Sequence, residues 1–166
     1  MKSQKQLKPK NYGNQLLFKP AFMWEKDIND FVKERIKGYS LNVPCGSSQL
    51  GDIRLDIDPK LSMREAFNFF KDKIPFPECT FDTVISDPPW KVGHYFRPKL
   101  FFTCVDVCKI GGTIIYNATW IPTSKCVKLK ELWIRQSSHF SNVSIISVFE
   151  KISNSSSLKE LEEQGK

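Results

Sequence analysis

The sequence predicts a compact α/β fold, with a mostly parallel sheet and helices on both of its faces. Two observations lead to this prediction. Strand-like and helix-like segments alternate along the 166 residues, which is the chain order of sheets whose parallel strands are joined by helices. The composition, with 40% hydrophobic and 26% charged residues, suits one globular core, and the chain is long enough to bury it.

The first half of the chain contains two predicted helices and two predicted strands. The first helix runs from Ala21 to Gly38, where apolar residues recur at roughly helical spacing. "YSLNVP" is a short apolar strand that leads into a Pro/Gly turn, and "GDIRLDID" alternates apolar and polar residues over 51–58. Residues 61–71 are predicted to form the second helix. The apolar residues that indicate the helix are Leu61, Ala66, Phe67 and Phe70.

The second half repeats the alternation. "FDTVIS", residues 81–86, is a β-branched strand. A helix marked by apolar residues from Leu100 to Cys108 is predicted to end at the Gly111-Gly112 pair. "TIIYNAT", residues 113–119, and "VSIISVFE", residues 143–150, are the remaining predicted strands. These elements complete the predicted sheet.

Basic residues outnumber acidic ones, with a formal net charge of +7 and a pI near 9.2. They are concentrated in two runs. Residues 1–10 hold four lysines and no acid, and residues 125–135 hold three lysines and an arginine against one glutamate. These runs favour a polyanionic partner such as nucleic acid. The alternative for each run is a solvated surface.

Signals for membrane insertion, secretion and metal binding are missing from the sequence. No apolar run approaches the roughly 18 residues of a membrane span, and the polar N-terminus lacks the apolar stretch of a signal peptide. Neither the five cysteines nor the two histidines have the spacing of a zinc site, and the cysteines do not suggest a disulfide framework. We expect a soluble cytoplasmic protein with no membrane partner, no metal ion, and reduced structural thiols.

The turn after the first strand, "VPCGSS", and the acids after the second have the chemistry of a nucleoside site. Gly46 lets a ligand approach the backbone, and the two serines after it supply donors. Asp56 and Asp58 are both candidates to bind a ribose diol. A dinucleotide fits poorly, because there is no G-x-G-x-x-G fingerprint and almost no room for a helix before the second strand. The alternative is a tight turn followed by a solvated strand end.

The stretch "SDPPW" ends the strand 81–86 and can bind a planar amino group. Pro88 and Pro89 remove two amide donors, so the turn presents carbonyl oxygens beside the Asp87 carboxylate. An exocyclic amine has two N–H donors, which Asp87 and the Pro88 carbonyl can accept. Trp90 offers a face on which a base can stack; the alternative is a rigid surface turn with Trp90 in the core. This turn and "VPCGSS" are expected to line one crevice at the carboxyl ends of the strands.

"FDTVISDPPW" resembles the strand and catalytic motif of class I amino-methyltransferases that use S-adenosylmethionine, and its tryptophan is typical of the N6-adenine branch. The resemblance implies the Rossmann-like fold of that family and S-adenosylmethionine as the cofactor. The implied catalytic residues are Asp87, Pro88, Pro89 and Trp90. The implied cofactor-binding residues are Pro44, Cys45, Gly46 and Asp56, with Asp58 as the alternative ribose ligand.

With this resemblance, the chain divides into a basic flexible arm at 1–19, a methyltransferase catalytic domain at 20–152, and a polar C-terminal tail at 153–166. No insert is large enough for a separate target-recognition domain. Target recognition is therefore expected from the arm, the residues after Trp90, the 120–140 segment, or a second subunit, either a homodimer partner or another protein. By position, Asn117 and Trp120 also point toward the predicted crevice.

The implied reaction is methyl transfer to the N6 amino group of adenine in nucleic acid, DNA in preference to RNA. One alternative is the same chemistry on RNA or on another planar amine, such as cytosine N4, guanine N2 or a glutamine amide. The other alternative is a non-catalytic subunit that only binds nucleic acid.

Overall fold

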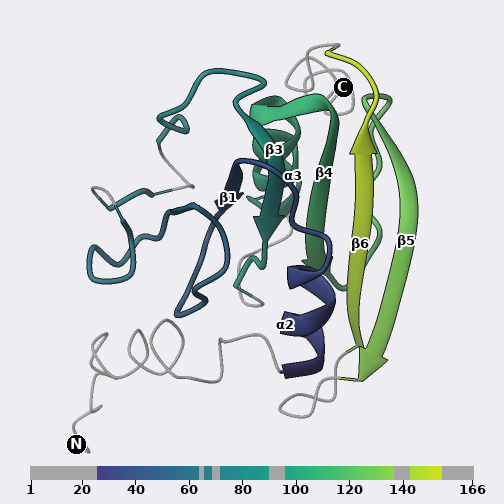
Figure 1. The fold of residues 1–166 in the computed structure, drawn as a ribbon, viewed down its shortest axis with the longest axis horizontal. Helices are drawn as coiled ribbons and strands as arrows, with labels where there is room; N and C mark the ends of the chain where they lie inside the picture. Colours follow the sequence, from purple (N-terminus) through teal and green to yellow (C-terminus); the bar gives the residue numbers. More distant parts are fainter. Residues whose placement is uncertain (1–25, 64–65, 69–71, 90–95, 137–142, 155–166) are drawn as a thin grey trace, which may run out of the picture.

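The computed structural model describes residues 26–63, 66–68, 72–89, 96–136 and 143–154. Two helices and six strands follow one another along this part of the chain (Figure 1). They are α2 (Lys26–Lys33), β1 (Ser40–Asn42), β2 (Ile53–Arg54), β3 (Phe81–Ser86), α3 (Phe96–Val107), β4 (Cys108–Ala118), β5 (Val127–Gln136) and β6 (Val143–Lys151).

The six strands form a single sheet in the order β2-β1-β3-β4-β6-β5. The strands from β2 to β4 are parallel, with Leu41 beside Val84 and Val84 beside Ile114. Strand β6 runs antiparallel to both of its neighbours, β4 and β5. Strand β5 comes last in the order and forms one edge of the sheet (Figure 1). The predicted mostly parallel α/β fold is confirmed.

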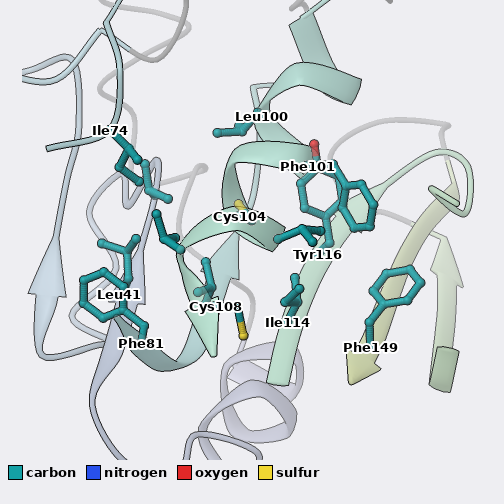
Figure 2. Close-up of a cluster of buried hydrophobic side chains, with 14 of the residues drawn as sticks. Leu41, Ile74, Phe81, Leu100, Phe101, Cys104, Cys108, Ile114, Tyr116 and Phe149 are labelled. Atoms are coloured by element: carbon teal, nitrogen blue, oxygen red, sulfur yellow. The ribbon is translucent and has the colours of Figure 1, made fainter. Parts of the chain in front are cut away.

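Neighbouring residues of the central strands point to opposite faces of the sheet, and each face buries its own cluster. On one face, Ile85 and Ile115 pack with Val32 of α2. On the other, Phe101 of α3 lies edge-on to Tyr116 of β4, with ring centroids 5.2 Å apart (Figure 2). Helices therefore cover both faces, as the sequence predicts.

The first helix is shorter than predicted. Within the predicted range 21–38, α2 spans Lys26–Lys33, and residues 21–25 lie outside the described residues. The Arg35 amide donates to the Val32 carbonyl at 3.0 Å, so the hydrogen bonds tighten to i→i−3 spacing and the helix ends.

The predicted helix at 61–71 is wrong for the part of it that the structure describes, residues 61–63 and 66–68. The Leu61 amide donates to the Asp58 carbonyl at 3.0 Å, and the Phe67 amide donates to the Asp56 carbonyl at 2.8 Å. Phe67 is buried in the cluster beneath α3. Its backbone is bonded to the loop after β2, which a helical hydrogen-bond pattern would not allow.

The Gly111-Gly112 pair does not end a helix. Helix α3 ends at Val107, and the pair lies inside β4 (Cys108–Ala118). The register between β3 and β4 shifts there, and Gly111 has φ +78°. A Cβ on Gly112 would lie 2.7 Å from the Cys108 Sγ of the same strand and 2.9 Å from the Asp82 carbonyl oxygen of β3. The glycines therefore permit an irregularity in a strand where β4 passes close to its neighbour.

Strand lengths also differ from the predictions. The strand predicted at 51–58 is reduced to β2 (Ile53–Arg54), while the last predicted strand is confirmed as β6. Strand β5 was not predicted, because a register shift between Leu129 and Glu131 interrupts its alternation and four of its ten residues are charged. The arm at 1–19 and most of the tail at 153–166 lie outside the described residues.

The structure joins none of the five cysteines in a disulfide. Within the described residues, no helix has the length and apolar character needed to cross a membrane.

Candidate functional site

The two unusual turns of the sequence lie at the same edge of the sheet. The Val43 amide donates to the Ile85 carbonyl at 2.9 Å, which holds the end of β1 beside the end of β3. The Cys45 amide donates to the Leu55 carbonyl at 2.9 Å, which ties the same turn to the end of β2. The carboxyl ends of these parallel strands therefore converge, as ligand sites in open α/β sheets require.

Asp56 fastens the glycine turn to the loop after β2. Its side chain is only 6% exposed. One carboxylate oxygen accepts the Gly46 amide at 2.8 Å, and the other accepts the Asp58 amide at 3.0 Å. Burial raises the pKa of Asp56, and the amide hydrogen bonds partly offset that effect. Gly46 adopts φ +50°, in the left-handed region that favours glycine.

Asp58 is more accessible than Asp56. It is half-buried, and its Oδ1 accepts the Lys60 amide at 3.0 Å. The two candidate acids therefore differ in burial and in hydrogen bonds. Asp56 is buried and both of its oxygens accept main-chain amides, whereas Asp58 is half-buried and its Oδ1 accepts one.

The turn Pro44–Cys45–Gly46 is closed by apolar and main-chain contacts. Pro44 and Cys45 are buried, and the Val43–Pro44 peptide bond is cis. Burial, and then the nearby Asp56, raise the pKa of the Cys45 thiol to about 12, so the thiol is neutral. Its Sγ lies 3.6 Å from the Leu61 carbonyl oxygen. Cys45 therefore packs the turn rather than supplying a nucleophile.

Two buried polar atoms beside this turn have no hydrogen-bond partner within the described structure. They are Asn42 Oδ1, at the end of β1, and Ser47 Oγ, directly after Gly46. Buried oxygens of this kind are costly unless something satisfies them. Their place at the carboxyl end of β1 fits a polar ligand that donates hydrogen bonds.

Asp87 is half-buried and lies directly after β3. Burial raises its pKa from 3.8 to about 7, and the hydrogen bond from Asn117 opposes part of this shift. The Asn117 Nδ2 donates to Asp87 Oδ1 at 2.9 Å. The amide of Asn117 therefore reaches the carboxyl group of the motif, while its place in a ligand crevice stays a prediction.

The rest of the tetrad is only partly described. Pro88 is buried and Pro89 is half-buried, directly after Asp87. Trp90 lies outside the described residues, so its stacking role stays a prediction.

Sequence reasoning missed two residues near the site, Ser144 and Arg97. The Ser144 Oγ donates to Asn117 Oδ1 at 2.6 Å. Arg97, in the first turn of α3, is buried and lies over the half-buried Trp120, 5.4 Å from its ring centroid. For Arg97, a basic residue soon after the motif was a signal that the sequence offered. For Ser144 the sequence offered no signal, because its partner Asn117 is 27 residues away.

Among the residues that the structure describes, no three or more histidine, cysteine, aspartate or glutamate side chains come together as a metal site would require.

No protein-family model and no curated protein match this sequence, but solved structures match its fold. An S-adenosylmethionine-dependent methyltransferase from Methanosarcina mazei is 8% identical, with a TM-score of 0.55 over 74% of this chain and 97% of that one. A TehB-like S-adenosylmethionine-dependent methyltransferase from Corynebacterium glutamicum is 13% identical, with a TM-score of 0.56 over 86% and 95%. The chain therefore has the Rossmann-like fold of these methyltransferases.

A further structure with this fold is the [4+2]-cyclase SpnF, 11% identical, with a TM-score of 0.54 over 76% of this chain and 81% of that one. The fold thus occurs in proteins that are named for different reactions. The reaction of this chain has to be argued from its own site residues.

Proposed function

We propose that this protein is a methyltransferase that transfers a methyl group from S-adenosylmethionine to the N6 amino group of adenine in nucleic acid, DNA in preference to RNA. One observation carries the proposal. The Asp87 carboxyl group, followed by two prolines, is held by Asn117 at the strand edge where the glycine turn also ends. An acceptor group for an amine and a nucleoside-like turn therefore share one edge of the sheet.

The cofactor would be held by the turn Pro44–Gly46 and by an acid after β2. We assign the ribose diol to Asp58, because Asp56 already accepts two main-chain amides. Asp56 would instead maintain the shape of the turn. Asn42 Oδ1 and Ser47 Oγ, which are buried without partners in the described structure, suit donors of the cofactor. The cofactor supplies a sulfonium methyl group, an electrophile that an amine can attack.

The target amine would donate one N–H to Asp87 and the other to the Pro88 carbonyl. These bonds draw the nitrogen lone pair out of conjugation with the ring and aim it at the methyl group. As the nitrogen–carbon bond forms and the carbon–sulfur bond breaks, positive charge grows on the nitrogen. The two oxygens stabilise that charge. A carboxyl group with a pKa of about 7 also accepts the leaving proton near neutral pH more readily than an ordinary aspartate.

Nucleic acid is the proposed substrate because the net charge of +7 favours a polyanion. RNA, or another planar amine such as cytosine N4, guanine N2 or a glutamine amide, is the second candidate, since the acceptor pair recognises an amino group and not a particular base. A homodimer or a partner subunit is proposed to supply target recognition. Nucleic acid and cofactor are both intracellular, so the cytoplasm is the proposed location.

The decisive experiment incubates the protein with S-adenosylmethionine carrying a labelled methyl group and with separate DNA and RNA pools. The nucleic acid is then digested and the labelled nucleoside identified by mass spectrometry. We expect N6-methyladenosine, or its deoxy form from DNA, with the wild-type protein and none with Asp87→Ala.

Calorimetry with S-adenosylmethionine is the control, and Asp87→Ala should bind the cofactor with nearly unchanged affinity. Cofactor binding without methyl transfer to any amine would identify a non-catalytic subunit. A fully active Asp87→Ala protein would refute the assignment of the motif.

A further inference from the structure

Three side chains from three neighbouring strands form a hydrogen-bonded chain that ends at Asp87. Ser144 on β6 donates to Asn117 on β4 at 2.6 Å, and Asn117 donates to Asp87, after β3, at 2.9 Å. Ser144 is 3% exposed and Asn117 is 6% exposed, so water does not replace these contacts. These hydrogen bonds run across the sheet, from β6 through β4 to the end of β3, at the edge where the candidate site lies.

The chain has a fixed direction. Asp87, when ionised, can only accept, so it faces Asn117 Nδ2; Asn117 Oδ1 then accepts from the Ser144 hydroxyl, which can donate or accept. An amide nitrogen can only donate, so Asp87 Oδ1 must be an unprotonated acceptor. If the Asn117 amide turned over, its oxygen would face a carboxylate oxygen, and the two acceptors would repel each other unless Asp87 were protonated.

Within the described part of the chain, the other ionisable groups packed around Asp87 do not titrate near neutral pH. Tyr116, next to Asn117 on β4, donates its hydroxyl to the Arg97 carbonyl at 2.8 Å, and burial holds its pKa well above the ordinary value. Arg97 on α3 carries a permanent positive charge. Burial also raises the pKa of Cys104 on α3 to about 12. Among the described groups that surround Asp87, protonation near pH 7 is therefore a property of Asp87 itself.

We propose that Asn117 and Ser144 are positioning residues: they hold one oxygen of the Asp87 carboxyl group and keep that group an acceptor for the target amine. The proposal rests on the proposed function for the identity of the amine. Asn117 acts directly on Asp87, and Ser144 acts through Asn117 by donating to its Oδ1, which holds the amide in place.

The first measurement needs no substrate. The pKa of Asp87 is followed by the carboxyl carbon signal in a ¹³C NMR titration, with Asp87→Asn to assign it. In Asn117→Ala, we expect the pKa to rise by roughly one to two units, the effect of losing one hydrogen bond to a charged group. Ser144→Ala should give a smaller rise, and Ser144→Thr, which keeps the hydroxyl, should restore the wild-type value.

Ser147→Ala is the matched control. Ser147 is also a buried serine on β6, and its hydroxyl has no hydrogen-bond partner in the described structure. The variant therefore removes a hydroxyl from the same strand and leaves the hydrogen bonds from Ser144 to Asn117 and from Asn117 to Asp87 unchanged. Its Asp87 pKa should equal that of the wild type. Melting temperatures establish that each variant is folded, and Ser144→Ala carries the test should Asn117→Ala fail to fold.

The second measurement is the pH dependence of kcat for methyl transfer. The acidic limb should move to higher pH in Asn117→Ala and Ser144→Ala by the same amount as the Asp87 pKa, with little change in the KM for the cofactor. An Asp87 pKa that is the same in all variants would overturn the proposal, and so would a pKa that moves without the pH profile. A wild-type protein that transfers no methyl group would instead refute the proposed function, while the NMR titration would still decide whether the chain controls Asp87.

Discussion

Burial of Asp87 should make the protein less stable at neutral pH than at acidic pH, and Asp87→Asn should remove that cost. The pKa of Asp87 is about 7 in the fold and 3.8 ordinarily. The unfolded chain therefore loses this proton first, so the contribution of Asp87 to stability is fully present below pH 3.8 and is lost as pH rises to about 7. A difference of about 3 units corresponds to about 4 kcal/mol.

Asp87→Asn keeps an oxygen that accepts the Asn117 amide but carries no charge. We expect the variant to be more stable than the wild type by up to about 4 kcal/mol at pH 8. The difference should shrink steadily below pH 7 and vanish near pH 4. For a domain of this size, the melting temperature should rise by roughly 2–4 °C for each kcal/mol.

The assay is urea unfolding of both proteins at a series of pH values from 4 to 8. Asp52→Asn is a control of opposite sign, because hydrogen bonds from Ser40 lower the pKa of Asp52, and its loss should destabilise the fold at neutral pH but not at acid pH. The same pH dependence in the wild type and in Asp87→Asn would refute the reasoning, since Asp87 would then ionise as freely in the fold as in the unfolded chain.

Three further outcomes are expected. Asp58→Ala should weaken S-adenosylmethionine binding about tenfold by calorimetry, with little change in melting temperature. Asp56→Ala should lower both the cofactor affinity and the melting temperature, because it also removes the hydrogen bond from Gly46. Loss of affinity in Asp56→Ala alone, with its melting temperature unchanged, would assign the ribose to Asp56. Deletion of residues 1–10 should weaken nucleic-acid binding and flatten its salt dependence, and an unchanged salt slope would show a solvated tail. Trp90→Ala should raise the KM for nucleic acid and lower the rate, with Trp90→Phe retaining part of both; a large loss of melting temperature with unchanged kinetics would make Trp90 a core residue.

The fold class was predictable because it depends on patterns that lie close together in the sequence. Alternation of short apolar strands with helical segments predicts the sheet, and consecutive residues such as Val84 and Ile85 divide between its two faces without further information. The position of Asp87 was predictable for the same reason, since a double proline after a β-branched strand ends that strand at the ligand-binding edge.

Two local predictions were wrong because distant partners outweighed local propensity. Phe67 has helical spacing from its apolar neighbours, but its amide bonds the Asp56 carbonyl and its ring enters the core beneath α3. The Gly111-Gly112 pair has the composition of a helix end, yet the close approach of the Asp82 carbonyl on β3 makes it the irregular part of a strand. Propensity is a weak prior where a tertiary contact competes with it.

The sequence by itself determined the α/β architecture. It also indicated the two turns, "VPCGSS" and "SDPPW", and the acids near them, at one edge of the sheet. Only the tertiary structure decided what those acids contact: Asp56 accepts the Gly46 amide across 10 residues, and Asp87 is reached by Asn117 across 30 and, through it, by Ser144. The reason is physical. Secondary structure follows from neighbours along the chain, whereas the environment of a carboxyl group depends on which strands the sheet places beside it, and burial and hydrogen bonds from those strands set its charge.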